Sequence, residues 1–278
     1  MSLSITSLNS GSNGNCYYVG NSQEAILVDA GLSCKETELR MQRLGLSLNN
    51  VKGIFISHEH ADHIRGVPVL ATKYELPVYI TTSTLRKCRF KLPKPLIKSF
   101  RANDPIQIGD LQVTAFAKLH DAVEPHSFVI NNNSVKVGVF TDIGAPCQQL
   151  IYHFQQCHAA FLESNYDEEM LDNGKYPYYL KTRIRGGHGH LSNKQALQLF
   201  LEHKPSYMSH LLLSHLSKEN NCPHLVKDLF ASQANGTEII VASRFEETPV
   251  YNITSTTDVI IRSPLSLTPK GPLQMELF

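Results

Sequence analysis

Short apolar segments alternate with turn-forming residues along the first part of the chain. Three segments have the apolar or alternating pattern of strands, at residues 3–8, 16–19 and 25–29. Residues 9–15, Asn-Ser-Gly-Ser-Asn-Gly-Asn, separate the first two and consist entirely of turn-forming side chains. We therefore expect antiparallel strands at the start of the chain. Residues 34–44 then change to a helical pattern, which Gly45 ends.

Strand-like and helix-like segments alternate through the rest of the sequence. The pattern predicts helices at residues 64–74 and 192–201. It predicts strands at residues 51–56, 78–80, 111–119, 127–130, 135–140, 159–162, 208–213, 238–242 and 259–261. No internal repeat is visible. This order indicates an α/β protein in which residues 1–262 form one domain. Residues 263–278, which begin with a Ser/Pro/Thr-rich stretch, are expected to form a flexible tail.

The composition is typical of a soluble globular protein. The chain has 278 residues, of which 42% are hydrophobic and 18% charged. No apolar run approaches the roughly 20 residues that a membrane helix needs, and the N-terminus lacks the basic and apolar regions of a signal peptide. The six cysteines are scattered without a C-x-x-C pair, so we expect them to be reduced. These features predict a cytoplasmic protein that is not held in a membrane.

The net charge is only +1, but its distribution along the chain is uneven. No acidic residue interrupts the seven basic residues of one segment, which are Arg86, Lys87, Arg89, Lys91, Lys94, Lys98 and Arg101. A solvated surface loop is the commoner role of such a run, whereas a phosphate-binding arm is the alternative. Both remain open. The residues we expect to contact an anionic substrate, hereafter the basic quartet, are Arg86, Lys87, Arg89 and Lys91.

The densest group of metal-binding side chains follows the predicted strand at 51–56. Residues 57–63 read Ser-His-Glu-His-Ala-Asp-His and hold three imidazoles and two carboxylates. His58 and His60 can share one metal ion, while Asp62 and His63 come after the backbone turns and can serve another. Neutral imidazole and carboxylate suit zinc, manganese or iron. A polar, solvated helix start is the alternative, and the density of donors favours the metal site.

Three further candidates lie just after predicted strands, and their positions suggest a common site. They are His120, Asp142 and His215. Any one of them alone is more often a structural residue, but strand ends at one sheet edge converge in space. We expect His58, His60 and His120 to hold one ion, and Asp62, His63 and His215 to hold a second. Asp142 would bridge two divalent ions, an arrangement suited to hydrolysis through an anionic transition state.

Taken in order, these residues resemble the motifs of the metallo-β-lactamase superfamily. The five motifs are matched by Asp29, the 58–63 turn, His120, Asp142 and His215, and the resemblance covers roughly residues 3–261. It implies a four-layer αββα sandwich with a dinuclear site at one edge. Asp29 also ends a predicted strand, where it can orient the metal-binding turn or act as an ordinary turn residue.

More specifically, the chain is similar to the YycJ/WalJ/VicX branch of that superfamily. The similarity lies in residues 9–15, 120–122, 140–144, 163–165, 176–177, 180–181, 183–184, 189–193 and 213–217. Members of the branch are described as double-stranded DNA exonucleases linked to mismatch repair and to cell-wall signalling loci. The chain departs from the expected pattern at Tyr166 and His126. Both departures leave open the substrate contacts of nearby loops, including the one we expect from Asn165.

The resemblance also assigns a catalytic histidine. Related nucleases such as ribonuclease Z carry an extra histidine upstream of the last ligand, and His190 occupies that place here. It implies that His190 protonates the leaving alkoxide or contacts the phosphate, with Asp62 as the second catalytic residue. A capping or core histidine is the alternative, and His188 can compete for the role.

The C-terminal residues resemble a peptide that binds the bacterial sliding clamp. Gln274, Leu277 and Phe278 supply the glutamine and the closing Leu-Phe pair of that pentapeptide. A frayed end or an edge strand that packs on its own domain is the alternative.

The sequence therefore predicts a hydrolase with two divalent metal ions per chain, zinc or manganese or iron. Its function is expected to be that of a 5′-to-3′ double-stranded DNA exonuclease in repair. One alternative is a thioester or lactone hydrolase similar to glyoxalase II. Another is a regulatory or scaffold protein with a vestigial site, which the intact set of donors disfavours.

Overall fold

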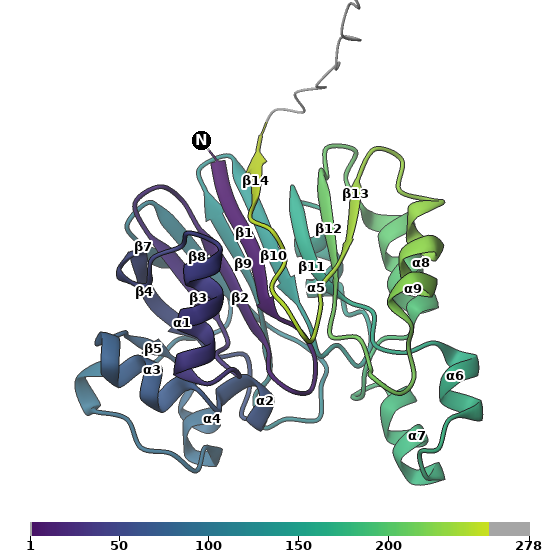
Figure 1. Ribbon diagram of the computed structural model, residues 1–278, viewed down its shortest axis with the longest axis horizontal. Coiled ribbons are helices and arrows are strands. Elements are labelled where there is room, and N and C mark those ends of the chain that lie inside the picture. The colour runs from purple at the N-terminus through teal and green to yellow at the C-terminus, as the bar shows by residue number, and fades with distance from the viewer. Residues whose placement is uncertain (1, 256–278) are drawn as a thin grey trace, which may run out of the picture.

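Two β-sheets packed face to face, with helices on both outer faces, form the four-layer αββα sandwich that the resemblance implied (Figure 1). The computed structural model describes residues 2–255. Each sheet has seven strands. The sheets lie in the middle of the molecule, and the parallel strands of each sheet end at the lower edge in Figure 1, near helices α2 and α7.

The first sheet is built mostly from the N-terminal half of the chain. Its order is β14-β1-β2-β3-β4-β5-β6. The strands are β1 (Ser2–Asn9), β2 (Cys16–Gly20), β3 (Ala25–Val28), β4 (Val51–Phe55), β5 (Val78–Tyr79), β6 (Ile97–Lys98) and β14 (Tyr251–Thr254). Pairing is antiparallel from β14 to β3 and parallel from β3 to β6. Parallel neighbours need crossover connections, and helices of the outer layer supply them.

The second sheet repeats this plan with the C-terminal half. Its order is β13-β12-β11-β10-β9-β8-β7. The strands are β7 (Ile106–Ile108), β8 (Leu111–Ala117), β9 (His126–Asn132), β10 (Val135–Phe140), β11 (Ala159–Glu163), β12 (His210–Ser214) and β13 (Glu238–Val241). Strands β7 to β10 pair antiparallel and β10 to β13 parallel. Parallel strands bring their C-terminal ends to one edge, where the loops carry most of the predicted site.

Helices cover the outer face of each sheet. Apolar side chains of α1 (Cys34–Arg43), α3 (Val67–Tyr74) and α4 (Thr82–Lys87) pack on the first sheet. Those of α5 (Gln148–Phe154), α8 (Asn193–His203) and α9 (Pro223–Ala231) pack on the second. Three short helices lie near the lower edge: α2 (Ala61–Ile64), α6 (Glu168–Asn173) and α7 (Tyr178–Arg185). Single 3₁₀ turns occupy Leu48–Asn50 and Lys94–Leu96. Within residues 2–255, no helix is long and apolar enough to cross a membrane.

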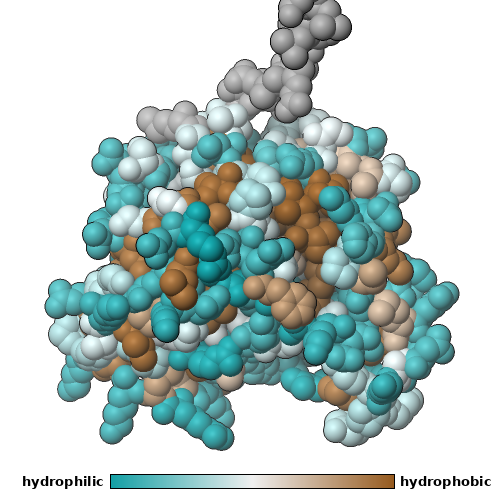
Figure 2. Space-filling model, viewed as in Figure 1, coloured by the Kyte–Doolittle hydropathy of each residue, from teal (hydrophilic) through white to brown (hydrophobic). Residues whose placement is uncertain are grey.

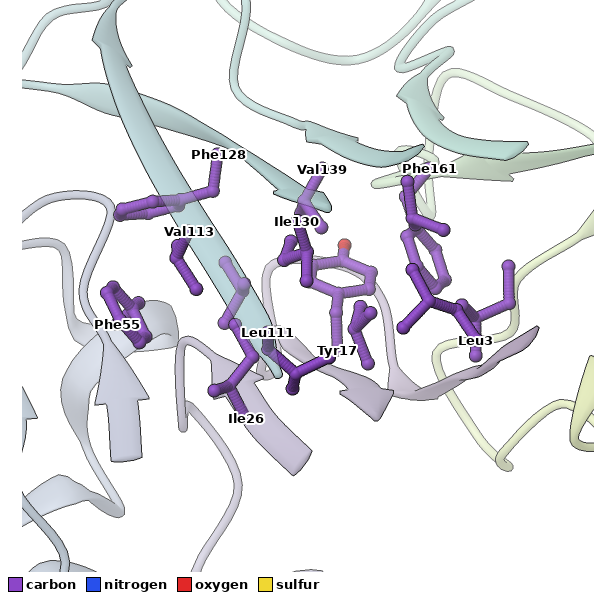
Figure 3. Close-up of a cluster of buried hydrophobic side chains, with 14 of the residues drawn as sticks. Leu3, Tyr17, Ile26, Phe55, Leu111, Val113, Phe128, Ile130, Val139 and Phe161 are labelled. Carbon is purple, nitrogen blue, oxygen red and sulfur yellow. The ribbon is translucent and has the colours of Figure 1, made fainter. Parts of the chain in front are cut away.

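The central core lies between the two sheets, where their apolar faces meet (Figure 3). Tyr17 of the first sheet packs against Phe161 of the second with ring centroids 5.0 Å apart. Phe55 meets Phe128 edge-on at 5.7 Å. Aromatic side chains that interlock in this way fix the two sheets relative to each other. The loops at the strand ends are therefore carried on a rigid support.

The structure corrects the expected helix at 64–74. Two helices, α2 and α3, occupy this stretch, and Gly66 lies between them. Its N–H donates to Ala30 O at 2.8 Å, and a Cβ there would lie 1.8 Å from Leu32 O. Only glycine allows this close approach, so the helical pattern is interrupted. Strand β14 was not predicted, and the expected strand at 259–261 lies outside the described residues.

Candidate metal centre and adjoining cavity

Several loops gather at the edge where the parallel strands end, and three of their residues have an unusual backbone. Asp29 follows β3, Asp142 follows β10 and His215 follows β12. All three have positive φ angles, of 60°, 55° and 55°. A left-handed conformation at a residue other than glycine costs about 1–3 kcal/mol and persists only where its surroundings enforce it. Such strain in three neighbouring loops indicates a functional site.

Three predicted histidines form one group of possible metal ligands. One ring nitrogen each of His58, His60 and His120 lies within 4.8 Å of the others. His58 Nε2 and His60 Nδ1 are 3.0 Å apart. His120 Nδ1 lies 3.1 Å from Gly189 O, which directs Nε2 of the same ring toward the centre.

A second group contains the other predicted ligands. Asp62, His63 and His215 each place one donor atom within 4.8 Å of the others. Asp142 lies between the two groups, because its Oδ2 is 3.3 Å from His63 Nε2 and its Oδ1 is 3.8 Å from His120 Nε2. The structure thus brings together all seven side chains that the sequence singled out, in the same two groups with Asp142 between them.

The arrangement fits divalent cations. His120 Nε2, His215 Nε2 and Asp142 Oδ2 are buried and have no hydrogen-bond partner. Each unpaired buried polar atom costs about 1–3 kcal/mol, and a protein rarely collects three of them in one place. Imidazole nitrogen and carboxylate oxygen together are the donor set of divalent transition metals. The chain therefore binds divalent metal at this edge.

The pKa shifts of the two groups point in opposite directions. Burial lowers the pKa of His120 to about 4, so this ring is neutral and its lone pair is available. Burial alone would also lower the pKa of His215, but Asp142, Asp62 and Glu163 raise it to about 10. The carboxylates around His215 therefore attract positive charge, which a bound cation would supply.

Asp29 makes the contacts expected of an orienting residue. It is fully buried. Its Oδ2 accepts hydrogen bonds from His63 Nδ1 at 2.7 Å and Ser57 Oγ at 2.8 Å, while Oδ1 accepts from Ser57 N at 2.8 Å. With Nδ1 of His63 occupied in this way, Nε2 is the atom that faces Asp62 and Asp142.

Glu163 belongs to the site but was not among the predicted site residues. It ends β11 and is fully buried. Its Oε1 accepts from His190 Nδ1 at 2.8 Å and from His215 Nδ1 at 2.9 Å. Burial would raise its pKa, but His190 and His215 lower it to about 2, so Glu163 is a carboxylate. The signal for it was present, since Glu163 ends an apolar strand as the predicted ligands do.

The contacts of His190 separate it from His188, the competing histidine. His190 is 20% exposed in its side chain and bonds to Glu163. His188 is exposed in the loop that follows α7. His190 is thus the histidine that a buried carboxylate orients beside the metal-binding groups.

A cavity of about 230 Å³ adjoins the centre. His190, His215 and Asn165 line it on the side of the metal-binding groups, and residues of α7 line it on the other side. Asn165 Nδ2 donates to His215 O at 2.7 Å, so this side chain also supports the turn that carries His215. The cavity is the space where a substrate group can reach His190.

The basic quartet is exposed and does not line this cavity. Arg86 and Lys87 form the last turn of α4, and Arg89 and Lys91 follow in the next loop. Within residues 2–255, none of the four makes an ion pair. Helices α4 and α7 lie at the lower edge on opposite sides of the site-bearing loops (Figure 1). Figure 2 shows the two lower parts of the molecule, which carry α4 and α7, separated by a notch and mostly hydrophilic at the surface. A substrate role for the quartet stays a prediction.

The two departures from the family pattern are packing residues outside the cavity. His126 lies on β9, is 3% exposed and contacts Glu124 O through Nδ1 at 2.9 Å. Tyr166 is also 3% exposed, and its carbonyl accepts from Asn193 N. Residues 274–278, which contain the predicted clamp-binding peptide, lie outside the described residues.

Comparisons with known proteins identify the family of the chain. Residues 24–215 match the family described as the beta-lactamase superfamily domain. The exodeoxyribonuclease YycJ of Bacillus anthracis is 38% identical over 230 residues, which cover 82% of this chain and 87% of that protein. The exodeoxyribonuclease WalJ of Streptococcus pneumoniae is 31% identical over 244 residues, covering 86% of this chain and 91% of WalJ.

A solved structure gives the same fold at lower sequence identity. The metallo-beta-lactamase fold protein YhfI from Bacillus subtilis superposes with a TM-score of 0.68 at 17% identity. The alignment covers 90% of this chain and 99% of YhfI.

Proposed function

This chain belongs to the beta-lactamase superfamily, and we propose that it is a metal-dependent hydrolase that cleaves phosphodiester bonds of DNA. The observation that carries this proposal is the group of seven buried or half-buried donor side chains beside the Glu163–His190 pair. Its two relatives named exodeoxyribonucleases, both aligned over more than four-fifths of this chain, support DNA as the substrate. We assign the enzyme to repair, as a 5′-to-3′ exonuclease of double-stranded DNA.

Two divalent ions, zinc or manganese with iron as a further option, are proposed as its cofactors. His58, His60 and His120 would hold one ion, and Asp62, His63 and His215 the other, with Asp142 between them. When bound, such ions make water nucleophilic at neutral pH and neutralise charge on the phosphate. The unpaired atoms of His120, His215 and Asp142 support this assignment.

His190 is proposed to protonate the leaving oxygen or to bind the phosphate. Its Nδ1 donates to Glu163, so its Nε2 is the atom available to a substrate in the cavity. The hydrogen bond to Glu163 fixes the orientation of the ring, and an imidazole positioned in this way can act as a general acid. Asp62 is proposed as the second catalytic residue, and Asn165 as a substrate contact in the cavity.

The basic quartet is proposed to hold the DNA backbone outside the cavity. Its four cations have no ion-pair partner within residues 2–255, so their charge is available to phosphates. Contacts of this kind position a duplex without reading its sequence. The positive charge on one side of the site-bearing loops would guide a DNA end toward the centre.

The tail at 263–278 is proposed to tether the enzyme to the sliding clamp in the cytoplasm. Leu277 and Phe278 would enter an apolar pocket of the clamp and Gln274 would bond at its rim. A short peptide that orders on binding gives modest affinity, roughly micromolar. Tethering would still raise the effective concentration of the enzyme at DNA.

The direct test is incubation of the protein with end-labelled duplex DNA and manganese, with product lengths followed over time. Progressive shortening from the 5′ end is the expected result. Internal cuts would contradict exonuclease action. Hydrolysis of a thioester or lactone without any cleavage of DNA would instead support a small-molecule hydrolase.

A further inference from the structure

Helix α7 exposes aromatic side chains that the fold does not use. None of its eight residues is buried, and Tyr178 and Tyr179 are 85% and 74% exposed. Residues 173–190 contain four basic residues and no acidic one. Exposed aromatic rings among cations are the usual composition of a surface that binds single-stranded nucleic acid.

One side of this helix faces the cavity. Leu180, Arg183 and Ile184 line it together with Tyr176, and their spacing of three or four residues places them on one face. Tyr179 precedes Arg183 by one helical turn, so both lie on the same side of α7. Tyr178 lies on the opposite side, because 3.6 residues per turn rotate it about half a turn away from this face.

Contacts with the metal-binding loops hold α7 in place. Arg183 forms an ion pair with Asp121, whose other oxygen lies 3.3 Å from His120 Nε2. The loop after α7 packs closely on the turn after β10, since a Cβ on Gly144 would lie 2.3 Å from Gly187 O. Tyr179 therefore lies on a fixed support, about 6 Å along the helix from Arg183.

We propose that Tyr176 and Tyr179 form the stacking platform for the base of the nucleotide next to the cleaved phosphate. This rests on the nuclease function proposed above and specifies how the same site holds its substrate. Tyr176 lines the cavity, whereas Tyr179 lies outside it on the same side of α7 as Arg183, so the terminal base would stack at the rim of the cavity once its pair has opened. Stacking on the tyrosines offsets the cost of opening the terminal pair, which favours DNA ends over internal positions.

The proposal is tested with Tyr179→Leu, Tyr179→Phe and, as a control from the opposite face, Tyr178→Leu. Each is assayed for kcat/KM on end-labelled duplex DNA, and on the same duplex with a terminal nucleotide that lacks its base. Tyr179→Leu should lower kcat/KM on intact DNA by roughly 5- to 150-fold, the range measured for removal of a stacked aromatic. Tyr179→Phe keeps the ring and should retain most of the activity.

The substrate without the terminal base isolates stacking from other contacts. The difference between wild type and Tyr179→Leu should shrink on this substrate, because no base remains to stack. If Tyr179→Leu matches wild type on intact DNA, or Tyr178→Leu loses as much, the platform is refuted while the nuclease function stands. If the wild type degrades neither substrate, both proposals fail.

Discussion

Replacement of Glu163 by Gln keeps the shape of the side chain but should change the tautomers of two histidines in the site, His190 and His215. Glu163 Oε1 accepts from the Nδ1 atoms of His190 and His215, and Oε2 accepts from the backbone N–H of Ile143 at 2.7 Å and Leu191 at 3.1 Å. Backbone N–H groups can only donate, so the amide oxygen of Gln must face them. Its NH₂ group then faces the imidazoles, which must accept at Nδ1 and carry their protons on Nε2.

The size of the effect follows from this change of tautomer. His215 Nε2 is buried, has no hydrogen-bond partner and lies 3.6 Å from Asp62 Oδ2. A proton on this atom removes the lone pair that a metal ion needs. Loss of such a supporting contact typically costs about 10- to 100-fold in metal affinity. His190 loses its carboxylate partner as well, and a lost general acid costs about 10²- to 10⁴-fold in turnover.

Two measurements check this prediction. Titration of the variant against a chelator should show a metal affinity about 10- to 100-fold weaker than that of the wild type. DNA turnover at saturating manganese should fall further, because His190 also loses its carboxylate partner. Glu168→Gln is the matched control, because Glu168 lies nearby on α6 and bonds to Lys194 rather than to the histidines. Unchanged metal affinity in Glu163→Gln would refute the tautomer argument.

The same variant has a pH signature in the metal-free protein. Burial would raise the pKa of Glu163, but His190 and His215 lower it from 4.5 to about 2. Since the folded-state pKa lies below that of the unfolded chain, the carboxylate stabilises the fold above about pH 4.5 and this stability is lost as the pH falls through about 2. Denaturant unfolding should show Glu163→Gln less stable than the wild type at neutral pH, with the difference narrowing toward pH 2.

Four other outcomes are expected. Asp142→Ala should lose both ions together, because Asp142 lies between the two groups, and elemental analysis that still finds one ion would contradict a shared ligand. His190→Ala should cut turnover by roughly 10²- to 10⁴-fold with metal content unchanged, whereas lost metal would show that His190 is a ligand. Neutralising the basic quartet should weaken DNA binding and reduce the slope of log K against log salt by up to about 0.9 per lost phosphate contact. An unchanged slope would support the alternative, that the segment is a solvated surface loop. Deletion of residues 274–278 should abolish binding to the organism's own sliding clamp in calorimetry. Binding that survives the deletion would show that these residues are not the clamp-binding segment.

The grouping of the seven donor side chains was predictable because each lies in or after a turn that follows an apolar strand. The regular pattern of 135–140, for example, corresponds to β10, and Asp142 comes two residues after its end. The 58–63 turn was predictable from the spacing of its own donor residues. The resemblance to a known family added the four layers that bring these strand ends to one edge.

Contacts between distant segments were not predictable, even where the position of a residue was informative, as for Glu163 at the end of an apolar strand. Glu163 matters because its carboxylate meets histidines 27 and 52 residues further along the chain. The break at Gly66 depends on the backbone of residues 30–32, and hydrophobic periodicity does not report such an approach. Helix α7 was not among the predicted helices, and the exposure of its tyrosines depends on which side chains the fold leaves uncovered.

Hydrogen bonds from both sheets support the turns that carry the metal-binding residues. Lys118 Nζ donates to Thr141 O at 2.7 Å, next to the strained Asp142. Ser10 Oγ accepts from the N–H of His215, also at 2.7 Å. Asn15 Nδ2 donates to Asp62 Oδ2 at 3.1 Å. These contacts come from both sheets, so the packed core enforces the left-handed turns and keeps the donor atoms close together.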